Sequence, residues 1–365
     1  MKREGWLRCA GRLCAWMIGF GLLFPELIWN EDTCRLSLEE GEKTESIASG
    51  EELMEMVLQA KPGEIKARSR ILELWNALWK RGRKVGNVSM EQKLVAQAPI
   101  GVFDSGVGGL TVAREIMRQI PNEKIIYFGD TARVPYGSKS KETVTRFSRQ
   151  IVRFLQTHQV KTIVVACNTA SAYALEDLEK EIDIPIIGVV KPGAKAASQA
   201  TRNGKIGVIA TEATIGSHIY SQYIKKINPE VTIYGKACPL FVPLVEEGLW
   251  EDPVTDEIAK RYLNELIDID IDTLILGCTH YPLIRSTVAR VMGEKVTLVN
   301  PAFETARELR EMLEKKELLN QEPIKLGENK YQFYVSDGAE KFKTFANSII
   351  KYGILSAKTI NIEEF

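Results

Sequence analysis

From residue 98 onward, short apolar runs rich in β-branched residues alternate with longer segments in which apolar residues recur every three or four positions. This alternation is typical of α/β proteins with parallel sheets. The runs are almost continuously apolar, as expected for strands covered by helices on both faces. The predicted strands span 99–103, 124–128, 162–166, 184–189, 205–210, 231–235, 272–277 and 296–300, and the predicted helices include 110–119, 142–158, 172–180, 256–267 and 305–315.

An internal repeat divides this α/β region. The stretch "IGVFDS" at 100–105 resembles "IGVIAT" at 206–211, and "VVACNT" at 164–169 resembles "ILGCTH" at 275–280. The repeat predicts two pseudosymmetric α/β domains that face each other, each contributing one cysteine. Because ligands bind beyond the carboxyl ends of parallel strands, we expect the active site in the cleft between the domains. We expect residues 98–191 and 303–365 to form the first domain, and residues 192–302 to form the second.

Residues 1–97 differ from the rest of the chain. Basic residues precede an uncharged apolar run from Leu13 to Phe24, which is too short for a stable membrane span and lacks a following small-residue cleavage site. Apolar residues at helical spacing predict one helix within 66–86. We expect this extension to be loosely ordered or to form one docked helix. Translation could also begin at Met90, which would make the first 89 residues dispensable.

Charge and cysteine usage narrow the class of protein. The formal net charge is zero, so electrostatics gives no reason to expect nucleic acid as the main ligand, and a small-molecule substrate is favoured. Six cysteines are scattered without a Cys-x-x-Cys pair. We interpret them as free thiols in the reducing cytoplasm.

Two of these cysteines, Cys167 and Cys278, each end an apolar run and precede polar residues. A thiol at the start of a helix meets unpaired N–H groups that favour its thiolate form, which is a base or a nucleophile. A buried packing cysteine is the alternative for either one. A pair could bind a metal together with His280, exchange disulfides, or act as opposed acid and base. The spacing is unusual for zinc and for redox motifs, and opposed acid and base fits the repeat best.

Other loops carry supporting residues. In "FDSGVGGLTV", Asp104 and Ser105 end the first strand, and the following glycines open a helix whose N–H groups could hold a carboxylate. A dinucleotide-binding loop is the alternative, although Thr111 stands where its third glycine belongs and Asp130 stands near the place of its ribose-binding acid.

Proton-transfer partners are also available. His280 follows Cys278 by two residues, Glu246 could approach the same cysteine, and Asp104 could lie beside Cys167. The turn-rich loop "GDTARVPYGSKS" at 129–140 could close over a polar ligand with Tyr136 and its neighbours.

The stretches "GVFDSGVGGLTV", "YFGDTARVPYGSKS", "VVACNTASAYAL", "ACPLFVPLVEEG" and "LGCTHYPLI" resemble, in order and spacing, the bacterial glutamate racemase family. The resemblance implies a cytoplasmic racemase that uses no cofactor or metal and interconverts L- and D-glutamate to supply D-glutamate for peptidoglycan. It implies that Cys167 acts on D-glutamate and Cys278 on L-glutamate, assisted by Asp104, Glu246 and His280. The substrate-binding positions that it implies are Asp104, Ser105, Tyr136, Gly137, Asn168, Thr169, Thr214, Thr279 and His280.

Two alternative functions share these features. Aspartate racemases use the same two-cysteine plan, although the loops "DSGVGG" and "GCTHYP" are of the glutamate type. A non-catalytic binding protein could keep the fold, but it would have no need of both thiols. The protein could be a homodimer under any of these functions.

Overall fold

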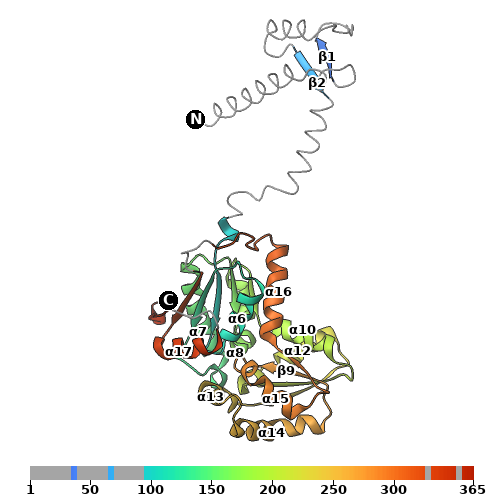
Figure 1. Cartoon of the computed structure of the whole chain (residues 1–365), viewed down its shortest axis with the longest axis vertical. Helices are drawn as coiled ribbons and strands as arrows, with labels where there is room; N and C mark the ends of the chain where they lie inside the picture. The colour runs from blue at the N-terminus through green and yellow to red at the C-terminus, as the bar shows by residue number, and fades with distance from the viewer. Residues whose placement is uncertain (1–33, 39–64, 70–93, 325–329, 351–355) are drawn as a thin grey trace. The chain divides into compact units, whose positions relative to one another are not determined.

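The computed structural model describes residues 34–38, 65–69, 94–324, 330–350 and 356–365 (Figure 1). The chain divides into two compact units, residues 1–88 and residues 89–365. In the first unit, β1 (Cys34–Leu38) pairs antiparallel with β2 (Ile65–Ser69). The helix predicted from Lys66 was therefore wrong over its first four residues, because their backbone is paired with β1. The remainder of that helix, the apolar run at 13–24 and Met90 lie outside the described residues.

The second unit contains a six-stranded parallel sheet in the order β12-β11-β4-β3-β5-β6. Its central strand β3 pairs with β4 on one side and with β5 on the other, so that Ile100 lies opposite both Ile125 and Thr162. The strands are β3 (Ile100–Asp104), β4 (Ile125–Gly129), β5 (Thr162–Val165), β6 (Ile186–Gly188), β11 (Tyr331–Val335) and β12 (Ala357–Thr359).

A separate four-stranded parallel sheet has the order β10-β9-β7-β8. Its strands are β7 (Lys205–Ala210), β8 (Thr232–Ala237), β9 (Thr273–Gly277) and β10 (Thr297–Val299). β7 lies between β8 and β9, just as β3 lies between β4 and β5, so the repeated motifs fall on equivalent strands of the two sheets. The parallel α/β fold and all eight predicted strands are confirmed, whereas β11 and β12 were not predicted.

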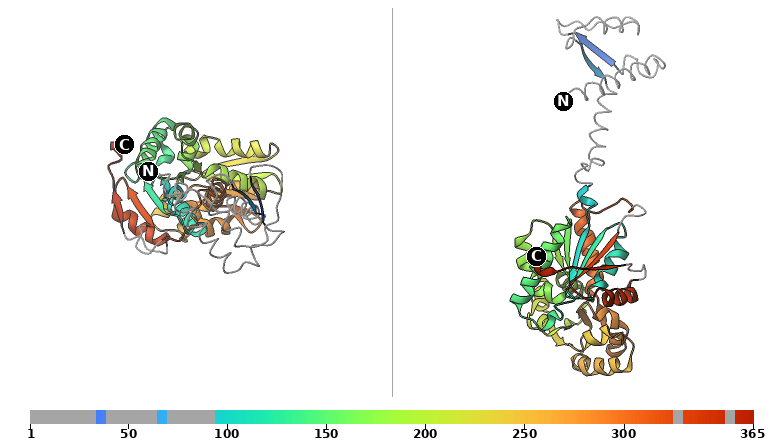
Figure 2. Two further views of the ribbon diagram at one scale, coloured as in Figure 1. Left: turned by 90° about the horizontal axis from the view of Figure 1, so that it is seen from above. Right: turned by 90° about the vertical axis from the view of Figure 1, so that its left-hand side faces the viewer.

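Helices cover both faces of each sheet (Figures 1 and 2). In the larger sheet α6, α16 and α17 pack on one face and α7, α8 and α9 on the other, while α10 and α12 face α13, α14 and α15 across the smaller sheet. The helices are α6 (Leu110–Gln119), α7 (Lys141–Thr157), α8 (Asn168–Tyr173), α9 (Leu175–Glu181), α10 (Val190–Ala200), α11 (Glu212–Gly216), α12 (Ile219–Ile227), α13 (Phe241–Glu246), α14 (Pro253–Asp268), α15 (Arg285–Met292), α16 (Pro301–Lys315) and α17 (Ala339–Ile349).

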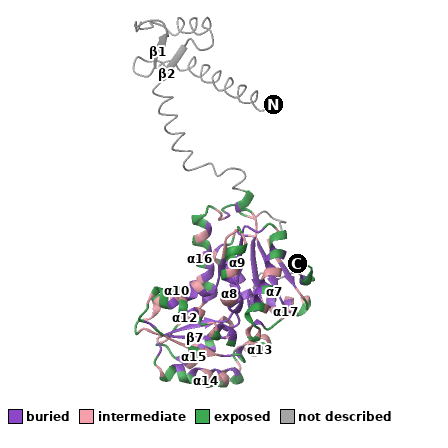
Figure 3. Ribbon diagram, turned by 180° about the vertical axis from the view of Figure 1, so that it is seen from behind, coloured by how far each residue is buried: buried purple, intermediate pink, exposed green. Residues whose placement is uncertain are grey.

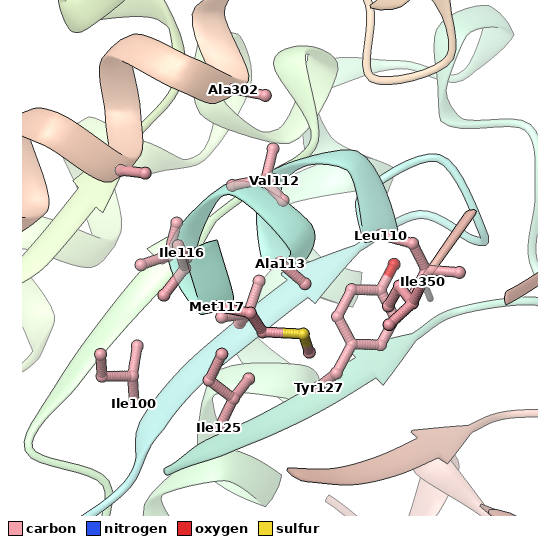
Figure 4. Close-up of a cluster of buried hydrophobic side chains, with 14 of the residues drawn as sticks. Ile100, Leu110, Val112, Ala113, Ile116, Met117, Ile125, Tyr127, Ala302 and Ile350 are labelled. Carbon is pink, nitrogen blue, oxygen red and sulfur yellow. The ribbon is translucent and has the colours of Figure 1, made fainter. Parts of the chain in front are cut away.

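Burial follows this layering. The central strands β3, β4, β5 and β9 are buried, whereas the outer faces of the helices are exposed (Figure 3). The apolar stripe of α6 shows the principle, because Ile116 and Met117 pack over Ile100, Ile125 and Tyr127 (Figure 4). Each such fully buried side chain contributes about 1.5–3 kcal/mol. Within the described parts of the chain, no helix combines the length and apolar character needed to cross a membrane.

The predicted helices are confirmed with shifted ends and one division. The helix predicted at 172–180 is instead α8 followed by α9, and α8 starts at Asn168 because the Cys167 side chain caps it. Sγ of Cys167 accepts a hydrogen bond from the backbone N–H of Ala170 at 3.5 Å. The first cysteine therefore lies at a helix N-terminus, as its motif predicted.

A buried ion pair joins the loops at the amino ends of the first-sheet strands. Nζ of Lys161 lies 2.5 Å from Oε2 of Glu123, and both side chains are at most 1% exposed. Lys161 also donates to the carbonyls of Ala96 and Leu318, and Glu123 accepts from the backbone N–H of Asn320 at 2.8 Å. Burial raises the pKa of Glu123 and lowers that of Lys161, so each charge depends on its partner and on these hydrogen bonds.

We expect Lys161→Met to lower the free energy of unfolding by about 3–5 kcal/mol, because it leaves the Glu123 carboxylate buried without a counter-charge. Urea unfolding followed by circular dichroism measures the change. The double variant Lys161→Met/Glu123→Leu should recover part of the loss. A single variant as stable as the parent chain would contradict the dependence of Glu123 on Lys161.

Candidate active site

One pocket collects side chains from the loops at the carboxyl ends of strands in both sheets. Its volume is about 430 Å³ when the part open to solvent is included. Cys167 enters from the loop after β5 and Cys278 from the loop after β9. The lining residues are Ser105, Gly106, Val134, Pro135, Tyr136, Gly137, Cys167, Asn168, Thr169, Thr211, Val242, Glu246, Cys278, Thr279 and His280.

Cys167 is held as a buried thiol. Its side chain is the N-cap of α8, and its Sγ lies 3.6 Å from Oγ of Ser105, to which it donates. Burial and the nearby Asp104 carboxylate raise the pKa of Cys167 to about 12, against the opposing effect of the Ala170 N–H and the Ser105 hydroxyl. A proton therefore stays on this sulfur near neutral pH, so the expectation that the helix start favours a thiolate was wrong for Cys167, because burial outweighs the helix N–H groups.

Cys278 has a different neighbour. Its Sγ lies 3.7 Å from Nδ1 of His280, and Nε2 of His280 lies 3.0 Å from Oε1 of Glu246. Burial opposes the charged imidazole, but Cys278 and Glu246 outweigh it and raise the pKa of His280 to about 10. The hydrogen bond to His280 in turn lowers the pKa of Glu246. Sulfur, imidazole and carboxylate thus form a chain along which a proton can move.

The second cysteine does not cap an α-helix. After β9 the chain forms a short 3-10 helix, Tyr281–Ile284, before α15 begins. Pro282 lies in its first turn and has no N–H to offer. The expectation that both cysteines lie at the start of an α-helix therefore holds for Cys167 alone. At Cys278, the neighbour of the sulfur is the His280 side chain instead of helix N–H groups.

Asp104 lies behind the pocket wall rather than on it. It is fully buried, and its carboxylate accepts from the backbone N–H of Gly106 at 2.9 Å and from Oγ1 of Thr279 at 3.4 Å. Burial raises the pKa of Asp104, while the His280 charge and the backbone N–H groups of its own loop oppose this. The carboxylate joins the loop after β3 to the loop after β9.

The glycine-rich loop packs directly against the second cysteine loop. A Cβ at Gly108 would lie 2.4 Å from Oγ1 of Thr279 and 2.5 Å from the His280 ring, so only glycine allows this approach. Thr111 reinforces it by donating to the carbonyl of Thr279 at 2.9 Å. Protein side chains therefore occupy the space where a dinucleotide-binding loop would hold a pyrophosphate, and the Gly106 N–H is already taken by Asp104.

Tyr136 and Gly137 belong to a short 3-10 helix, Tyr136–Ser138, on the pocket wall. The Tyr136 hydroxyl donates to Oδ2 of Asp130, a buried carboxylate that also accepts from Nε of Arg133. That bond directs the hydroxyl to Asp130, which leaves the ring and backbone of Tyr136 for the pocket. A Cβ at Gly137 would lie 2.7 Å from Thr211, so the two loops touch there.

Three threonine hydroxyls meet where α8 approaches α11. Oγ1 of Thr169 lies 3.0 Å from Oγ1 of Thr211 and 3.3 Å from Oγ1 of Thr214, and the last two are 3.0 Å apart. We call Thr169, Thr211 and Thr214 the threonine ring. Thr169 and Thr211 line the pocket, whereas Thr214 lies behind them and is 2% exposed.

Most of the residues named from the sequence converge on this pocket, with Asp104 and Thr214 one layer behind it. Sequence reasoning missed Thr211 and Val242, which also line it. Thr211 follows β7 in the motif that repeats "IGVFDS", at the position of Ser105, so the repeat could have identified it. Val242 lies in a Pro-interrupted apolar stretch that carries no comparable signal.

Metal binding and disulfide exchange were the alternative uses of the two thiols. In the parts of the chain that the structure describes, no group of three or more His, Cys, Asp or Glu side chains is arranged to hold a metal ion. Cys167, Cys238 and Cys278 are buried free thiols. The arrangement can offer two sulfurs and several hydrogen-bond donors to a small polar molecule.

Comparisons with known proteins identify the family of this chain. The family model described as Asp/Glu/Hydantoin racemase matches residues 100–309. A glutamate racemase from Geobacter metallireducens is 51% identical over 251 residues, which cover 69% of this chain and 92% of that protein.

Solved structures give the same result. Glutamate racemase isoform RacE1 from Bacillus anthracis is 42% identical with a TM-score of 0.68, and the match covers 72% of this chain and 97% of that one. The Francisella tularensis glutamate racemase, solved in complex with D-glutamate, is 38% identical with a TM-score of 0.68, over 74% of this chain and 100% of that one. The sequence resemblance is thereby confirmed, and the chain belongs to the Asp/Glu/hydantoin racemase family.

Proposed function

We propose that this chain interconverts L- and D-glutamate without a cofactor, using Cys167 and Cys278 as two opposed bases. The observation that supports this most strongly is that both thiols line one pocket while coming from equivalent strands of two different sheets. The similarity to glutamate racemases over more than nine-tenths of their length identifies the substrate. The product, D-glutamate, would supply peptidoglycan synthesis in the cytoplasm.

In the reaction, the thiolate of one cysteine removes the proton from Cα of glutamate and becomes a thiol. The electron pair left on Cα is stabilised by donors around the substrate carboxylate. The opposite cysteine gives its proton to the other face of Cα and becomes a thiolate. The stereocentre is inverted, no net proton is gained or lost, and the two sulfurs exchange protonation states.

The two thiols start from unequal states. Burial and Asp104 keep the proton on Cys167, whereas Cys278 contacts His280, which can hold a proton as a cation up to high pH. In this proposal Cys278, which contacts His280, is the base for L-glutamate and Cys167 is the acid. Glu246 assists by holding the imidazole through Nε2.

The remaining wall residues bind the substrate in this proposal. The hydroxyls of Ser105 and Thr169, the amide of Asn168 and the backbone at Gly137 lie on the pocket wall and suit a substrate with two carboxylates. Thr279 lies on the same wall, although its hydroxyl donates to Asp104. Three further groups act through their neighbours because they do not face the pocket directly: Asp104, Thr214 and the Tyr136 hydroxyl.

A domain division accompanies this mechanism. We propose that residues 98–191 and 303–365 form the first domain, that residues 192–302 form the second, and that the pocket is the cleft between them. Residues 1–97 are an extension that carries none of the site residues.

Replacement of either sulfur by oxygen should nearly abolish racemisation. Cys167→Ser and Cys278→Ser should each lower kcat by at least about a thousandfold, because a hydroxyl is a far weaker base near neutral pH. Circular dichroism of D- and L-glutamate, without added cofactor, measures the rate. Cys238→Ser, a buried thiol outside the pocket, is the matched control and should stay active. Near-normal turnover in either site variant would refute the two-thiol mechanism.

The same assay on D- and L-aspartate separates the alternatives. Turnover of aspartate with none of glutamate would establish an aspartate racemase. Binding of either amino acid without turnover would establish a binding protein.

Loss of the Glu246 charge should shift the pH dependence. Glu246 raises the pKa of His280, so the imidazolium is retained below that pKa and lost as pH rises through it. Glu246→Gln should therefore move the alkaline limb of kcat/KM for L-glutamate to lower pH by about one unit. Profiles from pH 6 to 11 test this, with the exposed neighbour Glu247→Gln as control. An unmoved alkaline limb in Glu246→Gln would remove Glu246 from the proton chain.

The extension should be dispensable for catalysis. A chain that begins at Met90 keeps Ala96, whose carbonyl accepts from Lys161, and all of the pocket residues. We expect its kcat and KM for glutamate to lie within about twofold of those of the full chain, because changes away from the site and the core usually have small effects. A large loss of activity in the shorter chain would make the extension part of the enzyme.

A further inference from the structure

Tyr220 connects the surroundings of the two cysteines although it does not line the pocket. It lies on α12 beside the smaller sheet, and its hydroxyl donates to Oδ1 of Asn168 at 2.7 Å. Asn168 follows Cys167 directly and lines the pocket. Both side chains are buried, with exposures of 3% and 4%. Tyr220, beside the smaller sheet, thus holds Asn168, a pocket residue that follows a strand of the larger sheet.

The Tyr220 ring has little freedom to move. A Cβ at Gly277 would lie 3.2 Å from its Cε2, and a Cβ at Gly193 would lie 3.5 Å from its Cε1. The ring is therefore packed over the glycine that precedes Cys278, while its hydroxyl contacts the residue that follows Cys167. This packing makes the hydroxyl a donor at a fixed position.

The hydroxyl keeps its proton. Burial, and then the nearby Cys278, raise the pKa of Tyr220 well above its usual value. The protonated hydroxyl donates to the amide oxygen of Asn168, so in the structure Oδ1 lies on the Tyr220 side and the NH2 group lies on the other. With its oxygen held by Tyr220, the amide can present its NH2 group to a ligand.

We infer that Tyr220 is a positioning residue that orients the Asn168 amide so that its NH2 group donates to a carboxylate of the substrate. A reversed amide would present an oxygen to that carboxylate and repel it. The inference rests on the proposed glutamate racemisation, and it adds a residue that acts through Asn168 without touching the substrate.

Tyr220→Phe tests the inference because it removes only the hydroxyl. A hydrogen bond to a charged group is worth a factor of about ten to a hundred in binding, so KM for both glutamate isomers should rise about tenfold with kcat changed by less than about threefold. Tyr223→Phe is the matched control: it makes the same change on the same helix, where Tyr223 lies beside Lys191 and Lys226, and it should leave KM unchanged.

A double-mutant cycle distinguishes positioning from general support of the fold. Asn168→Ala should raise KM by about tenfold to a hundredfold, and adding Tyr220→Phe to it should raise KM no further. Multiplication of the two effects would overturn the inference, because Tyr220 would then act independently of Asn168. An unchanged KM in Tyr220→Phe would overturn it as well.

Asn168→Asp provides a second variant that keeps the Tyr220 bond, since a carboxylate also accepts from the hydroxyl. It has no NH2 group, so KM should rise at least about tenfold. A KM equal to that of the parent chain would refute the donor role of the amide. Failure of the parent chain to racemise glutamate would instead refute the proposed function, which keeps the two outcomes distinct.

Discussion

The buried carboxylate of Asp104 joins the two halves of the α/β unit. It ends the central strand of the larger sheet, accepts from its own loop through Gly106, and accepts from Thr279 beside the second cysteine. A carboxylate without any exposed surface is costly unless donors surround it, so both loops must stay where they are to satisfy it. The close approach at Gly108 and the bond from Thr111 to the Thr279 carbonyl hold the same junction.

This junction also makes the two thiols chemically unequal. The sheets repeat one strand order, yet Asp104 lies near Cys167 and raises its pKa, while His280 contacts Cys278. Two identical sulfurs would both favour the same protonation state. In the proposed reaction, proton removal on one face and proton return on the other require one thiolate and one thiol, and these unlike surroundings would supply that difference.

The fold could be predicted from the sequence because both sheets are built around buried parallel strands, whose apolar runs are easy to recognise. Strand β11 was missed because it follows a long polar stretch after α16 and pairs with β4, which lies far away in the chain. Strand β12 was missed because it is only three residues long. The pocket could be anticipated because its residues follow strand ends. Tyr220 could not, because an amphipathic segment does not reveal that one of its hydroxyls reaches Asn168, fifty-two positions earlier.

The threonine ring has a consequence for how the two halves can separate. A hydroxyl both donates and accepts, so each of its three members can turn its proton toward either neighbour or toward a water molecule. Water can replace such contacts at a small net cost in free energy, since a neutral hydrogen bond contributes only about 0.5–1.5 kcal/mol. At the edge where α8 meets α11, the molecule is therefore held together by contacts that water can replace.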